Sequence, residues 1–159
     1  MGRVEDVRRR FDSLADAVPA HVTLVFPFEH ETADAALVSH VEEAAHGVVA
    51  FDLELRAVTC SLDCFLFLLV DKGGDQVRDL HDRLYSGLLR PLLPDPVFTP
   101  HVTLGRFANA DECAAAMRTV KGMNLRVRTR AASLRIYDAI HVPYRVISEI
   151  HLAEAGRDS

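Results

Sequence analysis

Pro19-Ala20-His21-Val22-Thr23-Leu24 and Pro100-His101-Val102-Thr103-Leu104 are the two stretches of this 159-residue chain that decide its fold. Each stretch begins with a proline and carries a histidine and a threonine two positions apart. The histidines are 80 positions apart, which is about half the chain. Because the sequence around the two stretches also repeats, we predict a single structural unit used twice.

Similar apolar patterns flank the two stretches. Apolar residues at helical spacing precede each one: Val4, Val7, Phe11, Leu14 and Val18 before the first, and Val77, Leu80, Leu84 and Leu88 before the second. A further helix is predicted after each stretch. The first of these stops at Gly47, and the second begins at Asn109/Glu112, which resembles a capping box, and stops near Gly122.

Two strands are predicted at the end of each half. Residues 51–56 alternate between apolar and polar, and the apolar run 64–70 indicates a strand covered on both faces. In the second half residues 125–130 alternate, and a change of phase near Ala132 indicates a bulge. The last strand alternates over residues 145–152.

These elements predict a bilobal α+β fold in which an α-β-α-β-β unit occurs twice. Two antiparallel sheets with helices outside would be related by a pseudo-two-fold axis, and a central cleft would carry both His-x-Thr motifs. Residues 1–159 would form one domain with lobes at about 1–75 and 76–159, between which a strand or helix can be exchanged.

The two motifs suggest phosphoryl chemistry. Residues two apart in a strand share a face, so His21 with Thr23 and His101 with Thr103 would face one cleft. Two histidines with a pKa of about 6.5 can serve as acid and base at neutral pH. Threonine hydroxyls can donate to the non-bridging oxygens of a phosphodiester. No metal or other cofactor is required.

A structural interpretation competes with this one. A single His-Val-Thr-Leu segment is an ordinary strand, and alone we would interpret it as structural. Two copies at matching positions favour function, because packing alone does not explain a histidine and a threonine on both inner faces.

On these residues the chain resembles the 2H phosphoesterase superfamily, which includes bacterial 2'-5' RNA ligase proteins and cyclic phosphodiesterases. The resemblance covers nearly the whole chain and rests on residues 19–28, 100–106 and 133–144. It implies that one motif histidine is a general acid and the other a general base, with His21 as proton donor and His101 as acceptor. Family members usually begin with a strand, whereas this chain opens almost directly into a helix. Either the first sheet is a strand short or the start is placed too late.

The resemblance also suggests two substrate-binding residues. Arg106 matches an arginine that often follows the second motif and assists phosphate binding. It is five residues past His101, so a regular strand would point it away unless the strand ends or twists at Gly105. His141 and Tyr144 lie in the last hairpin, where Tyr144 would either stack on a base or close a turn.

Charge is unevenly distributed along the chain. The net charge of −5 argues against a protein that coats duplex nucleic acid. Residues 118–145, however, contain seven basic residues against one acid, Asp138. This basic stripe could attract a phosphate-bearing ligand, or Arg126, Arg128 and Arg130 could be the solvent face of a strand.

The three cysteines are an odd number without a secretory context, which predicts reduced thiols in a cytoplasmic protein. The longest apolar run, residues 64–70, is too short to span a bilayer, which needs about 20 residues. We therefore expect a monomer without a membrane segment or an obligate protein partner.

Three functions remain open. The first is metal-independent hydrolysis of a 2',3'-cyclic phosphate on an RNA end or small nucleotide, and the resemblance implies a 2'-phosphate product. The second is 2'-5' ligation of 2',3'-cyclic phosphate and 5'-hydroxyl RNA ends. The third is a nucleotide- or RNA-binding module without turnover.

Overall fold

The computed structural model describes residues 2–29, 32–94, 97–139 and 144–154. Its elements are, in order, α1 (Gly2–Phe11), α2 (Asp34–Ala45), β1 (Phe51–Cys60), β2 (Phe65–Lys72), α3 (Gly74–Leu84), the 3-10 helix η1 (Gly87–Leu92), β3 (His101–Arg106), α4 (Ala110–Gly122), β4 (Val127–Ala131), β5 (Ser133–Asp138) and β6 (Arg145–His151). The predicted α+β class with antiparallel sheets is confirmed.

The strands form two sheets of unequal size. The larger has the order β3-β2-β1-β4, and the smaller pairs β5 with β6. All neighbouring strands are antiparallel. The larger sheet therefore interleaves β1 and β2 from the first half of the chain with β3 and β4 from the second.

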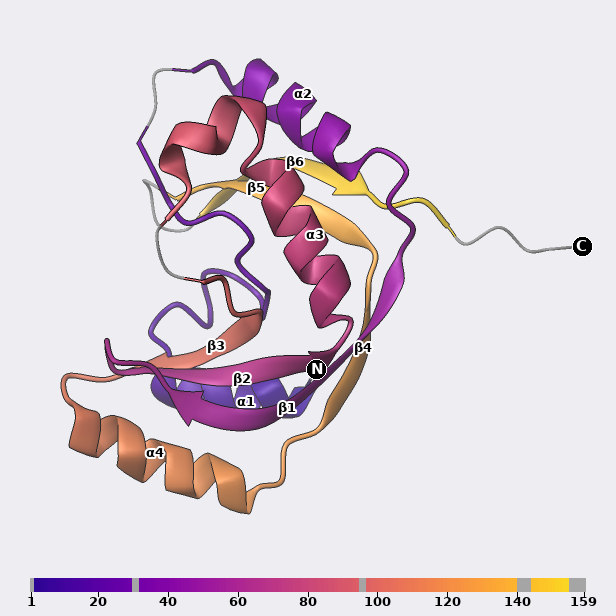
Figure 1. The fold of residues 1–159 in the computed structure, drawn as a ribbon. Coiled ribbons are helices and arrows are strands. Elements are labelled where there is room, and N and C mark those ends of the chain that lie inside the picture. The colour runs from indigo at the N-terminus through magenta and orange to yellow at the C-terminus, as the bar shows by residue number, and fades with distance from the viewer. Residues whose placement is uncertain (1, 30–31, 95–96, 140–143, 155–159) are drawn as a thin grey trace, which may run out of the picture.

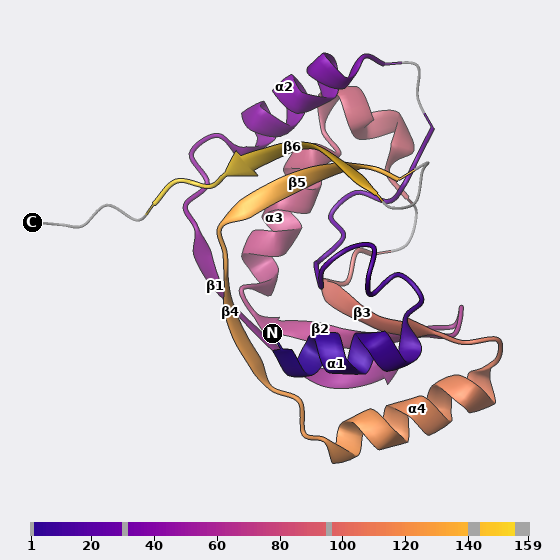
Figure 2. The same cartoon turned by 180° about the vertical axis from the view of Figure 1, so that it is seen from behind.

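Helices α1 and α4 cover one face of the larger sheet (Figures 1 and 2). Leu66, Leu68 and Leu104 are fully buried beneath them, in one cluster with Val4 of α1 and Val120 of α4. Burying such side chains stabilises a fold by about 1.5–3 kcal/mol each. The opposite face of β2 and β3 is free of α1 and α4. His101 and Thr103 of β3 lie on this face.

Helices α2 and α3 pack with the smaller sheet, as Figure 1 shows. Val41 of α2 and Leu84 of α3 are buried in a cluster that includes Leu134 and Ile150. Leu24 packs against this cluster and against the core of the larger sheet. The first motif thus lies where the two packed layers meet.

Several predicted helix boundaries are confirmed. Gly47 has a φ of +73°, which favours glycine, just after α2. The Asn109 side chain accepts the Glu112 N–H at 3.0 Å and caps α4. The first helix is shorter than predicted, because Asp12 Oδ1 accepts the Leu14 N–H at 3.0 Å and turns the chain after Phe11.

The change of phase near Ala132 has a different cause from the predicted bulge. Residues before it, in β4, pair with β1, whereas residues after it, in β5, pair with β6. The chain changes sheets at this point, so the apolar side must change too.

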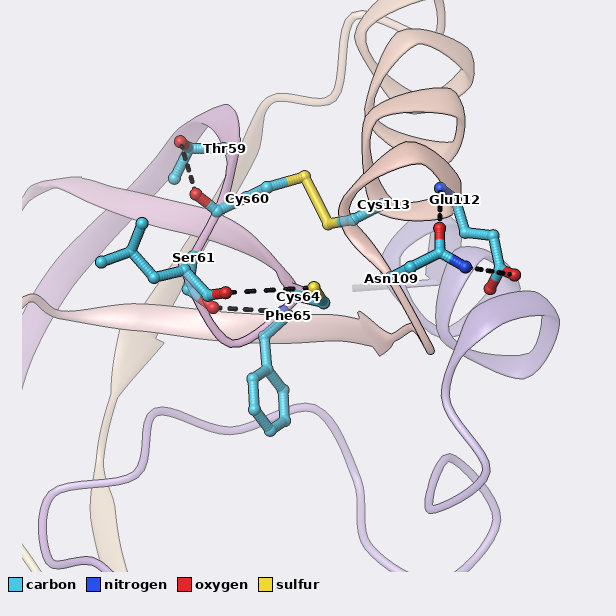
Figure 3. The surroundings of a disulfide bond; sticks show 9 residues. Thr59, Cys60, Ser61, Cys64, Phe65, Asn109, Glu112 and Cys113 are labelled. Carbon is cyan, nitrogen blue, oxygen red and sulfur yellow. Dashed lines mark hydrogen bonds between the residues drawn. A yellow bond between two sulfur atoms is a disulfide. The ribbon is translucent and has the colours of Figure 1, made fainter.

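The prediction of three reduced cysteines is wrong for two of them. Cys60 and Cys113 form a disulfide, with 6.3 Å between their Cα atoms, that links β1 to α4 (Figure 3). Cys64 is free. The bonded residues are 53 positions apart, so only the packing of α4 on β1 reveals the pairing. None of the helices in the described ranges has the length and apolar character needed to cross a membrane.

Candidate active site

The second motif lies on β3, at the edge of the larger sheet. Val102 and Leu104 are buried in the core, so His101 and Thr103 point to the opposite face. Across the ladder, Leu69 is the partner of His101 and Phe67 is the partner of Thr103. Regular strand alternation thus turns His101 and Thr103 away from the core that contains Val102 and Leu104.

The first motif is held beside β3 by one isolated antiparallel bridge, between Val22 and Val102. The expected strand is reduced to this bridge. Its register sets His21 opposite Thr103 and Thr23 opposite His101, with about 5 Å between opposed Cα atoms. Because Val22 packs into the core, His21 and Thr23 face the side that carries the second motif.

The two imidazoles are oriented in the same way. His21 Nδ1 lies 2.8 Å from the Pro19 carbonyl oxygen, and His101 Nδ1 lies 2.7 Å from that of Thr99. A carbonyl only accepts, so each Nδ1 carries the proton and donates it. The neutral rings therefore keep Nε2 available as a proton acceptor.

The surroundings of the two rings differ. His101 is partly buried and stacks on Phe67, with ring centroids 3.6 Å apart, whereas His21 is exposed. Burial lowers the pKa of His101 below its ordinary 6.5. The hydrogen bond to Thr99 acts in the other direction, and the charge of nearby His21 lowers the pKa further. His101 thus favours the neutral form.

Arg106 returns to the site face through a β-bulge. Leu66 pairs with Gly105 and Phe67 pairs with Thr103, which leaves Leu104 as the additional residue on β3. The guanidinium of Arg106 lies over the ring of Phe65, 5.1 Å from its centroid. The bulge removes the parity objection to Arg106 as a site residue.

Gly105 also brings α1 close to the site. A Cβ atom there would lie 2.6 Å from the Phe11 carbonyl oxygen, so only glycine fits without a backbone shift. The end of β3 and the end of α1 are therefore in direct contact.

Side chains of α1 hold the segment that leads to His21. Arg8 is 2% exposed, and its Nη1 donates to the Val18 carbonyl at 2.9 Å. Glu5 Oε1 accepts the Ala20 N–H at 2.6 Å. Arg8 is itself paired with Glu5 and with Asp12, at 3.2 and 2.8 Å. We name Glu5, Arg8 and Asp12 the α1 clamp.

Comparison with known proteins identifies the family of this chain. The family model described as "2'-5' RNA ligase superfamily" matches residues 2–140. The chain belongs to the 2'-5' RNA ligase superfamily, the 2H phosphoesterases.

Individual relatives of this superfamily member are distant. It is 26% identical to a Bacillus licheniformis protein named "Putative phosphoesterase", over 87% of this chain and 79% of the relative. Proteins of the same name from Geobacillus thermodenitrificans and Geobacillus kaustophilus are 29 and 30% identical over 72 and 62% of this chain. Those two alignments cover 66 and 58% of the relatives' own lengths.

The basic stripe of this 2H phosphoesterase is largely paired with acids. Glu54 of β1 accepts hydrogen bonds from Arg126 Nε at 2.7 Å and from Arg128 Nε at 3.2 Å. The bond from Arg126, aided by that from Arg128, holds the pKa of Glu54 below its usual range. Arg130 lies 3.7 Å from Asp52. These arginines thus form an ion-paired strand face rather than an open phosphate-binding surface.

Tyr144 is not joined to the site by any contact that the structure describes. It precedes β6 and is partly buried, without a hydrogen bond or ring contact to another described residue. His141 lies outside the described residues. Within the described ranges, no cluster of three or more His, Cys, Asp or Glu residues is arranged to hold a metal ion.

The sequence did not single out Phe65, Phe67 or the α1 clamp. Strand alternation could have found the phenylalanines, which share a face while Leu66 and Leu68 share the other. Helical spacing aligns Arg8 with Val4, but nothing local distinguishes Arg8 from the arginines that follow it.

Proposed function

We propose that this chain is a metal-independent phosphodiesterase that opens a 2',3'-cyclic phosphate, on an RNA end or small nucleotide, to a 2'-phosphate. The observation that supports this most is the Val22–Val102 bridge, which relates two imidazoles with the same Nδ1–carbonyl hydrogen bond. Two imidazoles that each keep Nε2 free of this hydrogen bond suit a displacement that needs one base and one acid.

In the proposed reaction His101 is the base. Its lowered pKa keeps Nε2 unprotonated at neutral pH. Nε2 takes a proton from water as the water oxygen forms a bond to phosphorus. The bond from phosphorus to the 3' oxygen then breaks.

His21 is the proposed acid. Its protonated Nε2 donates a proton to the leaving 3' oxygen, which gives a free 3'-hydroxyl and a 2'-phosphate. Thr23 and Thr103, opposite His101 and His21, are suited to donate hydrogen bonds to the non-bridging oxygens. Arg106 would add positive charge at the end of β3, on the side of the candidate site where its guanidinium lies over Phe65.

The decisive experiment is hydrolysis of adenosine 2',3'-cyclic phosphate with EDTA present, with the product identified by phosphorus NMR. We expect turnover to the 2'-phosphate that persists under chelation. Loss of turnover in EDTA, restored by a divalent cation, would overturn the metal-independent mechanism.

A parallel assay separates the two other candidates, with RNA that ends in a 2',3'-cyclic phosphate and RNA that has a 5'-hydroxyl end incubated together. Joining of a 2',3'-cyclic phosphate end to a 5'-hydroxyl RNA end, faster than hydrolysis, would show ligation. Binding of the cyclic nucleotide without turnover would show a binding module.

A further inference from the structure

An open hollow of about 400 Å³ lies where the ends of α1 and β3 meet. Its walls include Arg9, Arg10, Phe11 and Asp12 from the α1 end, and Arg106 and Phe107 from the β3 end. Phe11 and Phe107 contact each other, with ring centroids 5.7 Å apart. The contact of Gly105 with the Phe11 backbone fixes the two ends against each other.

The hollow is positively charged. Asp12, its one acid, is already bound to Arg8, at 2.8 Å, and to the Leu14 N–H. Among the described residues, neither Arg10 nor Arg106 is paired with a carboxylate. Each guanidinium lies over a phenylalanine ring instead, at 4.9 Å for Arg10 over Phe11 and 5.1 Å for Arg106 over Phe65. These arginines can therefore accept an anion, unlike the ion-paired arginines of β4.

The hollow adjoins the candidate active site. Arg106 lies over Phe65, which stacks with Phe67, and Phe67 stacks on His101. On the other side, the antiparallel register that sets His21 opposite Thr103 carries the preceding segment back along β3 toward Arg106. One ligand can thus extend from the histidines to the hollow.

We propose that the hollow binds a second phosphate group of the substrate, one nucleotide away from the cyclic phosphate. Guanidinium groups match phosphate oxygens in geometry and charge. The inference rests on the proposed function and narrows it to substrates with a 5' phosphate or phosphodiester beyond the reacting phosphorus. A nucleoside cyclic phosphate without that group would leave Arg10 unused.

The test compares kcat/KM for three substrates: adenosine 2',3'-cyclic phosphate, the same compound with a 5'-phosphate, and a short oligoribonucleotide ending in a 2',3'-cyclic phosphate. A charge-assisted hydrogen bond contributes about 1.5–3 kcal/mol, so we expect at least about a tenfold preference for the phosphorylated substrates. Preference for the oligoribonucleotide over the 5'-phosphate compound would indicate RNA ends rather than small nucleotides.

Arg10→Gln should lower this preference several-fold. Arg118→Gln, which removes the same charge from the exposed surface of α4, should retain it. Equal preferences in the wild type, or equal losses in both variants, would overturn the inference.

A binding measurement separates this inference from the proposed reaction. Adenosine 5'-phosphate, titrated by NMR, should bind the wild type more tightly than Arg10→Gln even if no substrate is hydrolysed. If adenosine 2',3'-cyclic phosphate is hydrolysed and a 5'-phosphate changes neither kcat/KM nor binding, the proposed reaction stands. The proposal that the hollow binds a second phosphate is then wrong. Phosphate-dependent binding without any turnover would refute the reaction alone.

Discussion

The two halves of the candidate site present the same local geometry on different supports. His101 belongs to β3, between β2 and the bridge to the first motif, and its ring stacks on Phe67. His21 is exposed on a segment with a single bridge. The first half relies on side chains, whereas the second relies on a backbone ladder.

Side chains hold the first motif from two directions. The α1 clamp binds the backbone before His21. After it, His81 Nδ1 lies 2.8 Å from the Leu24 carbonyl and the Phe26 N–H donates to the Tyr85 hydroxyl at 3.1 Å. His81 is buried and stacked on Phe98, which supports a structural role for this histidine.

This asymmetry suits an acid and a base at one phosphorus. Two groups with identical surroundings would compete for the same protonation state, whereas different surroundings can separate acid from base. Burial lowers the pKa of His101, which favours its neutral form. In the proposed reaction, the repeat would therefore provide the two reacting groups, and the different surroundings of His21 and His101 would assign their roles.

The largest effect on kcat should come from removing either of the two proposed reacting groups. His21→Ala and His101→Ala should each reduce kcat by about 10²–10⁴-fold on a 2',3'-cyclic nucleotide. Because the two act as a unit, the double variant should be little worse than the poorer single variant. A folded single variant with near-wild-type kcat would break the acid–base pairing.

A smaller effect should follow when the support of the first motif alone is removed. Arg8→Met leaves Glu5 and Asp12 without their cation, at a cost of about 3 kcal/mol in the free energy of unfolding. It also frees the Val18 carbonyl, so we expect kcat to fall by about tenfold or more through misplacement of His21. The free energy of unfolding and kcat are both measured at a temperature well below the midpoint of thermal unfolding.

The matched control for Arg8 is Arg78→Met, which removes an exposed arginine paired with Asp75 at 2.9 Å. Its effect on stability should be within about 0.5 kcal/mol. If Arg8→Met lowers the unfolding temperature while kcat in the folded protein is retained, the clamp stabilises the fold without positioning the site.

The pH dependence of kcat/KM tests the half of the candidate site that contains His101. The acid limb of kcat/KM, where the base gains its proton, should have its midpoint below 6.5 because burial lowers the pKa of His101. Phe67→Leu opens the ring to water and should move this midpoint toward 6.5. Phe65→Leu, which does not contact His101 in a stacked pair, should leave the midpoint in place. A midpoint above 6.5 in the wild type would contradict the burial argument.

The free energy of unfolding should also depend on pH through His101. Between the lowered pKa of folded His101 and the ordinary value of 6.5, the unfolded chain binds more protons. The free energy of unfolding should therefore rise with pH in this window. The contribution is complete above about 6.5 and is lost as the pH falls through the lower value.

The sequence predicted local features better than long-range ones. The motif faces of β3, the end of α2 at Gly47 and the Asn109 cap each depend on a few adjacent residues. Pairing of β1 with β4, by contrast, depends on surfaces more than 70 positions apart, as in Glu54 opposite Arg128.

The site was predicted in part for the same reason. The repeat indicates His21 and His101 as candidates, but the bulge that turns Arg106 depends on how β3 aligns with β2. The disulfide likewise requires the packing of α4 on β1, which no local spacing encodes.

The smallest effect on turnover should come from the Cys60–Cys113 disulfide, which lies on the opposite side of the larger sheet from the candidate site. It joins β1 to α4, whereas the ring of Phe65 points away from it toward the site face (Figure 3). Cys60→Ser with Cys113→Ser should lower the free energy of unfolding by about 2–4 kcal/mol, because the crosslink limits the unfolded chain. The kcat of the folded variant should match the wild type, and Cys64→Ser provides the control for loss of a thiol.

Since neither motif contacts the disulfide, a fall in kcat equal to that of Arg8→Met would mean that α4 supports the site through the sheet. The contrast between a first half held by side chains and a second half held by a backbone ladder would then be incomplete.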